Sequence, residues 1–181
     1  NLIKVSCSST ISSYDQHDKV IEAVSKIRNK DKVQLMFLLT YGGTENEKQR
    51  IISKIKSELH GFNFAIIDNF LSNEELAAYR KLTDIYINMR ISDQMAGAVI
   101  ESLYEGALLL SASWLNYQTL DDIGVTYYKV PTFDTLQQMI DDKIHAIQSF
   151  KQEYAKKNRN KILKEFSLES TINKWTNLYT S

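Results

Sequence analysis

The sequence predicts an α/β fold: a Rossmann-like, doubly wound parallel sheet of about six strands, with helices on both faces and further helices at the C-terminus. Short apolar, β-branched segments alternate with segments whose apolar residues recur at helical spacing along the whole chain. The clearest unit is segment 83–111, which reads as strand, polar turn, helix and strand. Such a unit joins two parallel strands through a right-handed crossover.

The predicted strands are mostly apolar, as expected where helices cover both faces of a sheet. Their predicted ranges are 2–7, 33–39, 62–67, 84–89, 108–111 and 125–130.

Apolar stripes and capping residues predict the helices between the strands. Thr44 with Glu47, and Ser72 with Glu75, have the spacing of capping boxes that open two of them. In the central unit the stripe begins at Met95, and Gly106 takes the place of a C-terminal cap. The final helix is predicted to be capped by Ser167 and to carry Ile172, Trp175 and Leu178 on one face.

The chain has 181 residues, which fits one domain. Near Phe150 the mixed pattern gives way to charged helix, so we expect a Rossmann-like core over 1–149 and C-terminal helices of the same domain over 150–181. A strand is predicted from Leu2 onward, and the first residue is not Met. We therefore expect a segment of a longer protein whose N-terminal domain is absent here.

Composition weighs against several classes of function. Lys plus Arg and Asp plus Glu number 22 each, so no overall charge draws the chain to nucleic acid. The single cysteine, Cys7, cannot form an internal disulfide, which fits a reducing cytoplasm. No apolar run is long enough to span a bilayer. His and Cys are too scattered for a metal site, and neither the dinucleotide fingerprint nor the P-loop motif is present.

The candidate site lies at the carboxyl end of the predicted strand 84–89. There a polar turn runs directly into a helix start, a place where free backbone amides favour anionic groups such as phosphate. The turn contains Arg90, Asp93 and Gln94, and Gly97 permits close approach of a ligand to the backbone. Asp93 and Glu101 flank the helix start; alone they also fit a solvated surface pair.

Other candidates have alternatives that the residues leave open. Gly42 and Gly43 follow a strand and fit either a plain turn or a binding loop. His17, in the loop after the first strand, fits a helix cap, a surface residue or a functional group. Trp114 and Tyr117 fit either core aromatics or the lining of a sugar or base pocket. The basic run 151–164 fits a solvated face better than a binding patch.

Together these residues resemble the C-terminal, donor-binding half of GT-B glycosyltransferases of the family-four type. The spacing Asp93-x7-Glu101 resembles the family's E-x7-E motif, with Gly106 at the glycine place. Segment 69–76, Phe166-Ser167-Leu168 and Leu178-Tyr179 are also typical of the family. Ser8, Ser9 and Thr10 replace its phosphate-binding Arg and Lys. The loop that ends in His17, and Tyr41-Gly42, look more like bacterial 4-acetamidofucose transferases, which leaves a retaining or an inverting outcome open.

The resemblance implies a UDP- or TDP-sugar donor, with no metal and no other cofactor. It implies that Glu101 binds the ribose, that amides near Gly97 bind the diphosphate, and that Asp93 faces the donor sugar. Asp93 and His17 are the expected catalytic residues. The other expected substrate-binding residues surround the phosphates, the sugar or the base: Ser9, Tyr41, Gly42, Arg90, Gln94, Phe70 and Leu71.

The implied function is the nucleotide-sugar-binding half of a bacterial glycosyltransferase for surface polysaccharide synthesis. The acceptor, a glycan or a lipid-linked molecule, would meet the missing N-terminal domain, and the isolated segment is expected to be inactive. The expected location is the cytoplasm; the inner face of the cell membrane, with peripheral association of the full-length protein, stays open as an alternative. A nucleotide-sugar 2-epimerase and a non-catalytic binding module are the competing functions.

Overall fold

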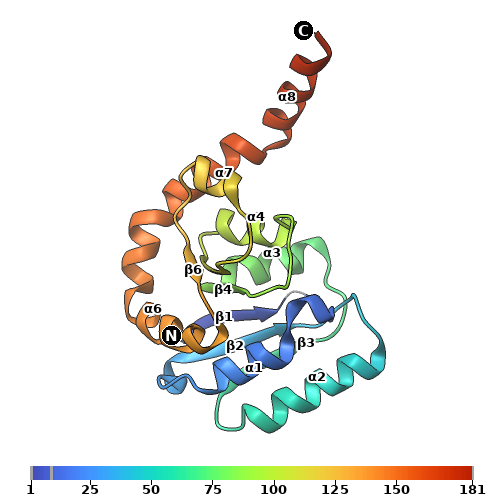
Figure 1. The fold of residues 1–181 in the computed structure, drawn as a ribbon, viewed down its shortest axis with the longest axis vertical. Helices are drawn as coiled ribbons and strands as arrows, with labels where there is room; N and C mark the ends of the chain where they lie inside the picture. Colours follow the sequence, from blue (N-terminus) through green and yellow to red (C-terminus); the bar gives the residue numbers. More distant parts are fainter. Residues whose placement is uncertain (1, 9, 181) are drawn as a thin grey trace.

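A computed structural model of the chain describes residues 2–8 and 10–180, without the side chains at positions 8, 173, 174, 177, 178 and 180. Its sheet has six parallel strands in the order β3-β2-β1-β4-β5-β6, which confirms the predicted doubly wound fold (Figure 1). The strands are β1 Ile3–Ser8, β2 Val33–Leu38, β3 Asn63–Ile67, β4 Ile85–Asn88, β5 Leu108–Ala112 and β6 Tyr128–Val130.

The strand order reverses where β1 meets β4. β1 pairs with β2 on one side, and Val5 and Ser6 pair with Ile85 and Tyr86 of β4 on the other. In open parallel sheets the crevice outside the carboxyl ends of the strands at this switch point is the usual ligand site. The fold therefore places the loops after β1 and β4 together.

The helices form two groups that cover the two faces of the sheet (Figure 1). In the first group α1 packs against α2 and α6, and in the second α4 packs against α3 and α7. Both predicted capping boxes, Thr44 with Glu47 and Ser72 with Glu75, are present. The bounds are α1 His17–Ser25, α2 Glu45–Glu58, α3 Asn73–Leu82, α4 Gly97–Tyr104, α5 Gln118–Asp122, α6 Phe133–Phe150, α7 Lys156–Phe166 and α8 Leu168–Thr180.

Two predicted boundaries are wrong. Met95 lies before α4 with a left-handed φ of 59°, so the central helix begins only at Gly97. β6 begins at Tyr128 rather than at Val125, because the backbone of the preceding residues bonds elsewhere. The Val125 amide donates to the Leu120 carbonyl, and the Asn158 side chain bonds both the amide and the carbonyl of Thr126.

The C-terminal part continues from α6 without a break. A π-helical stretch, Lys151–Ala155, joins α6 to α7, and Ser167 separates α7 from α8. Figure 1 shows α8 projecting away from the sheet. Leu168, Ile172, Trp175 and Tyr179 are exposed on it; the Leu178 side chain lies outside the described residues. Among the described residues no helix is both long and apolar enough to cross a membrane.

Candidate functional site

A buried polar cluster lies at the switch point, and Asp15 is at its centre. The Asp15 carboxylate accepts a hydrogen bond from the Thr10 hydroxyl and lies 3.2 Å from Nε of Arg90, the residue that follows β4 by two positions. Asp15 is only 6% exposed. Burial raises the pKa of this carboxyl, although Thr10 and the Arg90 guanidinium oppose the rise. A buried carboxylate with a perturbed pKa and a specific charged partner is a candidate for a functional site.

His17, the first residue of α1, joins this cluster. Its Nε2 atom lies 3.9 Å from the Asp15 carboxylate and has no hydrogen-bond partner among the described residues. The ring is 4% exposed, and burial lowers its pKa in spite of the neighbouring Asp15 carboxylate. The imidazole is therefore neutral near pH 7, as a general base must be. His17 and Arg90 both lie beside Asp15, an aspartate that the sequence pattern did not point to.

Asp93 takes part in a second network beside the first. Its Oδ2 atom accepts hydrogen bonds from the Tyr117 hydroxyl and from Asn88 Nδ2, the latter at 2.9 Å, and its Oδ1 atom accepts the Ala96 amide at 3.2 Å. Burial and the bond to Asp93 raise the pKa of the Tyr117 phenol, which keeps it a donor. Both Asp93 oxygens are thus used inside the protein, and its contact with a donor sugar stays a prediction.

Gly97 opens α4 immediately after this network. A Cβ atom at this position would meet only Glu101 Oε1, at the ordinary distance of 3.5 Å, and the backbone φ does not require glycine. Packing therefore gives no reason for a glycine here. The missing side chain does leave the first amides of the helix open to an anion, which is the role that the resemblance implied.

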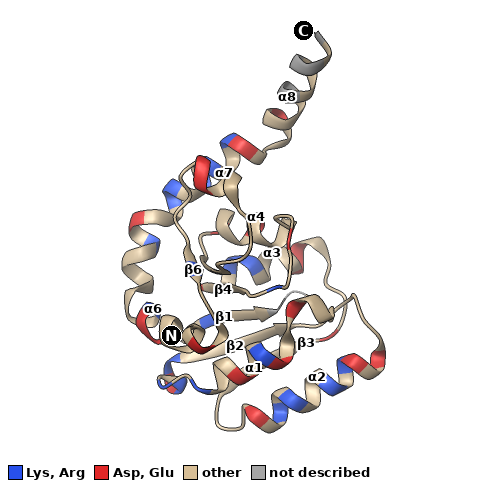
Figure 2. Ribbon diagram, viewed as in Figure 1, with Lys and Arg blue, Asp and Glu red and all other residues tan. Residues whose placement is uncertain are grey.

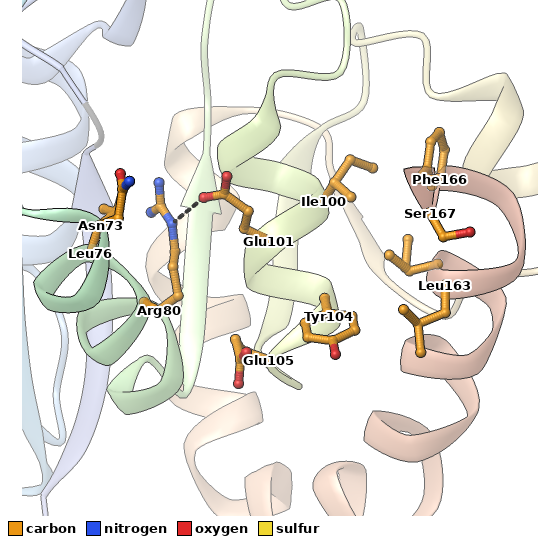
Figure 3. Close-up of a pocket in the computed structure, with 12 residues that line it drawn as sticks. Asn73, Leu76, Arg80, Ile100, Glu101, Tyr104, Glu105, Leu163, Phe166 and Ser167 are labelled. Carbon is orange, nitrogen blue, oxygen red and sulfur yellow. Dashed lines mark hydrogen bonds and ion pairs between the residues drawn. The ribbon is translucent and has the colours of Figure 1, made fainter. Parts of the chain in front are cut away.

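Glu101 faces a pocket of about 400 Å³ between α3, α4 and α7 (Figure 3). Nε of Arg80, on α3, lies 3.3 Å from Glu101 Oε2. The Arg80 side chain is 6% exposed and that of Glu101 is 53% exposed, so a buried cation fixes a carboxylate that solvent and ligands can still reach. The remaining wall is mainly apolar and includes Leu76, Ile100, Leu163 and Phe166.

The other predicted site residues are spread over the same edge of the sheet. The backbone φ of 93° explains Gly42, and the Ile11 side chain, which a Cβ at Gly43 would meet at 2.6 Å, explains Gly43. Tyr41, Phe70 and Gln94 are exposed, and Leu71 packs partly against a small cluster around Met36. Ser9 lies outside the described residues.

Sequence reasoning missed Asp15, Arg80 and Asn88. Asn88 had a visible signal, because it is a polar residue that ends an otherwise apolar strand. Asp15 had a weaker one, two positions before His17 in a polar loop. Arg80 had none, since a cation on a helix is usually solvated, and only the packing of α3 against α4 buries it.

Surface charges and potential metal ligands point to no further binding site among the described residues. Figure 2 shows basic and acidic residues interspersed on α1, α2 and α7. Within the predicted basic run, Lys151 pairs with Asp84, Arg159 bonds the Tyr104 hydroxyl, and Lys157 lies over the Tyr154 ring. No group of three or more potential metal ligands occurs among the described residues.

Comparison of the fold with known proteins gives a consistent result. No protein-family model matches the sequence, and no curated protein does. A glycosyltransferase from Rickettsia africae matches with a TM-score of 0.79 and 18% identity, over 99% of this chain and 47% of that one. Anabaena HepE, in complex with UDP and glucose, matches with a TM-score of 0.80 and 13% identity, over 99% and 48%.

The fold is glycosyltransferase-like. A third match is the C-terminal domain of a group 1 glycosyl transferase from Francisella tularensis, with a TM-score of 0.68 and 12% identity over 92% of this chain and 87% of that domain. This chain spans slightly less than half the length of the Rickettsia and Anabaena proteins. The present chain therefore corresponds in length to about one half of each of these two GT-B proteins.

Proposed function

We propose that the chain is the donor-binding half of a glycosyltransferase that uses a nucleoside diphosphate sugar. The observation that carries the proposal is the placement of Glu101: a buried arginine fixes its half-exposed carboxylate beside a pocket, one helical turn after the open amides at Gly97. A fixed carboxylate can accept two ribose hydroxyls, while the amides bind the diphosphate.

The reaction is transfer of the sugar from the nucleoside diphosphate to a hydroxyl of a glycan or lipid-linked acceptor, in the synthesis of a bacterial surface polysaccharide. In this scheme Arg90 offsets phosphate charge, and His17 and Asp93 act near the transferred sugar. The acceptor binds the other half of the protein, at the inner face of the membrane or in the cytoplasm. Support comes from the glycosyltransferase-like fold and from a UDP complex among its structural neighbours.

Calorimetry of the 181-residue chain with UDP and TDP, with ADP and GDP as comparison ligands, tests this proposal. We expect weak binding of a pyrimidine nucleotide that EDTA does not change, and no sugar transfer by this chain alone. Binding that EDTA abolishes, or no nucleotide binding at all, would contradict it.

A second candidate function, a non-catalytic binding module, has an observation of its own. Both carboxylate oxygens of Asp93 accept hydrogen bonds from other groups of the protein. The cavity lined by Asp15 and Arg90 has a volume of only about 10 Å³. A module of this kind would bind the nucleotide but would transfer no sugar even when joined to its upstream half. Turnover of UDP- and TDP-sugars by the full-length protein separates the two functions.

A further inference from the structure

The two edge strands of the described sheet, β6 and β3, differ in how they are protected. β6 has only three residues, and at its centre Lys129 is exposed, with its Nζ atom 2.8 Å from an Asp121 carboxylate oxygen. The ammonium group of Lys143 lies 3.6 Å from the centroid of the Tyr128 ring on the same strand. A short edge strand that carries lysine is a common protection against pairing with another chain. β6 is therefore a poor template for a further strand.

β3, at the other edge, has none of these protections. Its five residues and the preceding Phe62 include no charged residue and no proline. Its register with β2 runs without a bulge from Asn63 to Ile67. Residues 64–67 are partly exposed, whereas their partners in β2 are buried. A regular, apolar and open edge of this kind is a ready template for another strand.

The backbone of β3 determines which of its residues can pair outward. The Leu39 amide donates to the Ile67 carbonyl at 2.8 Å, so Ile67 directs its backbone groups toward β2. Successive residues of a strand direct these groups to opposite sides. Ala65 therefore also bonds toward β2, whereas Phe64 and Ile66 direct their amides and carbonyls away from the sheet. Two donors and two acceptors thus line the outer edge of β3.

We propose that β3 pairs antiparallel with β3 of a second copy of this chain, around a two-fold axis at Ala65. In this register Phe64 of each copy lies opposite Ile66 of the other, so the outward amides and carbonyls bond one another. The same two side chains pack across the strands, as aromatic and β-branched residues do. Ala65 faces its own counterpart at the axis, where the two strands are closest and a small side chain fits.

Charges at the two ends of β3 are complementary in this arrangement. A Cβ atom at Gly61 would lie 3.7 Å from Lys30 Nζ, so an exposed lysine lies where the edge strand begins. Asp68, also exposed, follows the last residue of the strand. Antiparallel pairing brings the beginning of each β3 beside the end of the other, so Lys30 of each copy approaches Asp68 of its neighbour. Parallel pairing would instead bring the two lysines together, so the charges favour the antiparallel arrangement.

This pairing leaves both candidate sites open. β2 separates β3 from β1, so the switch point lies about 10 Å from the paired edge. Because the paired strands run in opposite directions, the carboxyl ends of the two sheets open on opposite sides of the dimer. The contact is isologous and closed, since no free β3 edge remains. The inference is therefore independent of the proposed function.

Charge substitution at the two-fold axis tests the proposal. Ala65→Lys and Ala65→Glu each place like charges opposite one another, so each variant alone should be a monomer. An equal mixture of the two variants should form a dimer again, because lysine then faces glutamate. Sedimentation equilibrium from about 1 µM to about 1 mM protein is the measurement, and the wild-type mass should rise from that of one chain toward that of two. Lys129→Glu, on the other edge strand, is the matched control and should dimerise as the wild type does.

Circular dichroism checks that the variants are folded. If substitution at Ala65 unfolds the chain, the exposed residues at the ends of β3 decide: Asp68→Lys should weaken the dimer several-fold, and adding Lys30→Glu should restore it. A wild-type chain that stays monomeric over the whole range would overturn the proposal and leave the edge to a strand of another polypeptide. Growth beyond a dimer, or folded variants whose mixture stays monomeric, would also overturn it.

UDP calorimetry keeps this test separate from that of the proposed function. The wild type and Ala65→Lys should bind UDP with equal affinity, since the edge lies apart from the candidate site. A dimer that binds no nucleotide would contradict the proposed function alone. A monomer that binds UDP would contradict the pairing of β3 alone.

Discussion

Arg80 is almost fully buried while its ion-pair partner, Glu101, is half exposed, at an N–O distance of 3.3 Å. The guanidinium also lies over the rings of Tyr79 and Tyr86, at 5.7 and 5.9 Å from their centroids. The cation therefore keeps favourable contacts even without the carboxylate. Glu101 in turn is placed by a rigid neighbour, although its own burial contributes little to the fold.

This relationship predicts the result of Glu101→Ala. We expect UDP affinity to fall, because a lost charge-assisted hydrogen bond to a ribose hydroxyl is worth about 1.5–3 kcal/mol. The melting temperature should also fall, because the buried Arg80 guanidinium loses its carboxylate partner. Glu105→Ala, which alters the same wall of the pocket on the same helix, is the matched control for calorimetry. A variant that melts much earlier yet binds UDP normally would make Glu101 a structural residue.

The two glycines of the α4 region should respond in opposite ways to alanine. Gly97→Ala fills open space at the start of a helix, so stability should stay the same or rise by up to about 1 kcal/mol, while a Cβ beside the helix amides weakens nucleotide binding. Gly106→Ala should destabilise the fold, because its φ is 92° and its Cβ would lie 3.1 Å from that of Ala155. Urea denaturation and UDP titration of both variants measure this contrast; equal effects on stability would refute it.

His17 should make stability depend on pH. Burial holds its pKa below the usual value of about 6.5, so the unfolded chain binds the proton more readily than the native one. The stability that the neutral His17 side chain allows is therefore complete above a pH of about 6.5 and is lost as the pH falls below it. The charged groups that face His17 are Asp15, Asp18 and Arg50. The raised pKa of Asp15 has the opposite effect on the free energy of unfolding, because it lowers that free energy as the pH rises above about 4.

A comparison of two variants isolates the contribution of His17 to the pH dependence of stability. As the pH falls from about 7.5 to about 5.5, the free energy of unfolding of the wild type should decrease relative to that of His17→Gln. His145→Gln, which alters an exposed histidine on α6, is the control. Urea denaturation across this range is the measurement. A difference for His17→Gln that does not vary with pH would mean that the imidazole is not kept neutral by burial.

Asn158 should be important for stability without any role in binding. It is 1% exposed, and its amide bonds both backbone groups of Thr126, at 2.9 and 2.8 Å. Asn158→Ala leaves these groups without partners, and we expect a loss of about 1–3 kcal/mol. Asn160→Ala, at an exposed position of the same helix, is the control and should have almost no effect. Thermal unfolding of the two variants checks this, and equal melting temperatures would show that water replaces the amide.

The sequence allowed the fold to be predicted because its signals are local and repeated. Apolar segments such as Val33–Leu38 and capping residues such as Ser72 specify single elements, and the alternation of elements leaves few topologies. Met95 was misassigned because its apolar side chain fits the helical stripe while its backbone is left-handed. Such a conformation has no signature in hydrophobic spacing.

The candidate site was harder to predict, since its key pairs join distant segments. Asp15 meets Arg90, and Arg80 meets Glu101, only after the sheet and its helices have formed. Residue spacing left two alternatives for both Trp114 and Tyr117, a place in the core or in the lining of a sugar or base pocket. The structure separates them, because Tyr117 is 1% exposed and bonds Asp93, whereas Trp114 lines an open cleft.

The position of β1 in the sheet has a consequence for how the chain folds during synthesis. β1 lies between β2 and β4, and its partners in β4, such as Ile85 for Val5, follow far later in the sequence. On the ribosome, the three strands β1 to β3 therefore emerge with the centre of the future sheet still an open edge. Such edges pair with other chains, and distant pairings form slowly. We expect nascent chains that stop before β4 to need more chaperone protection than those that include it.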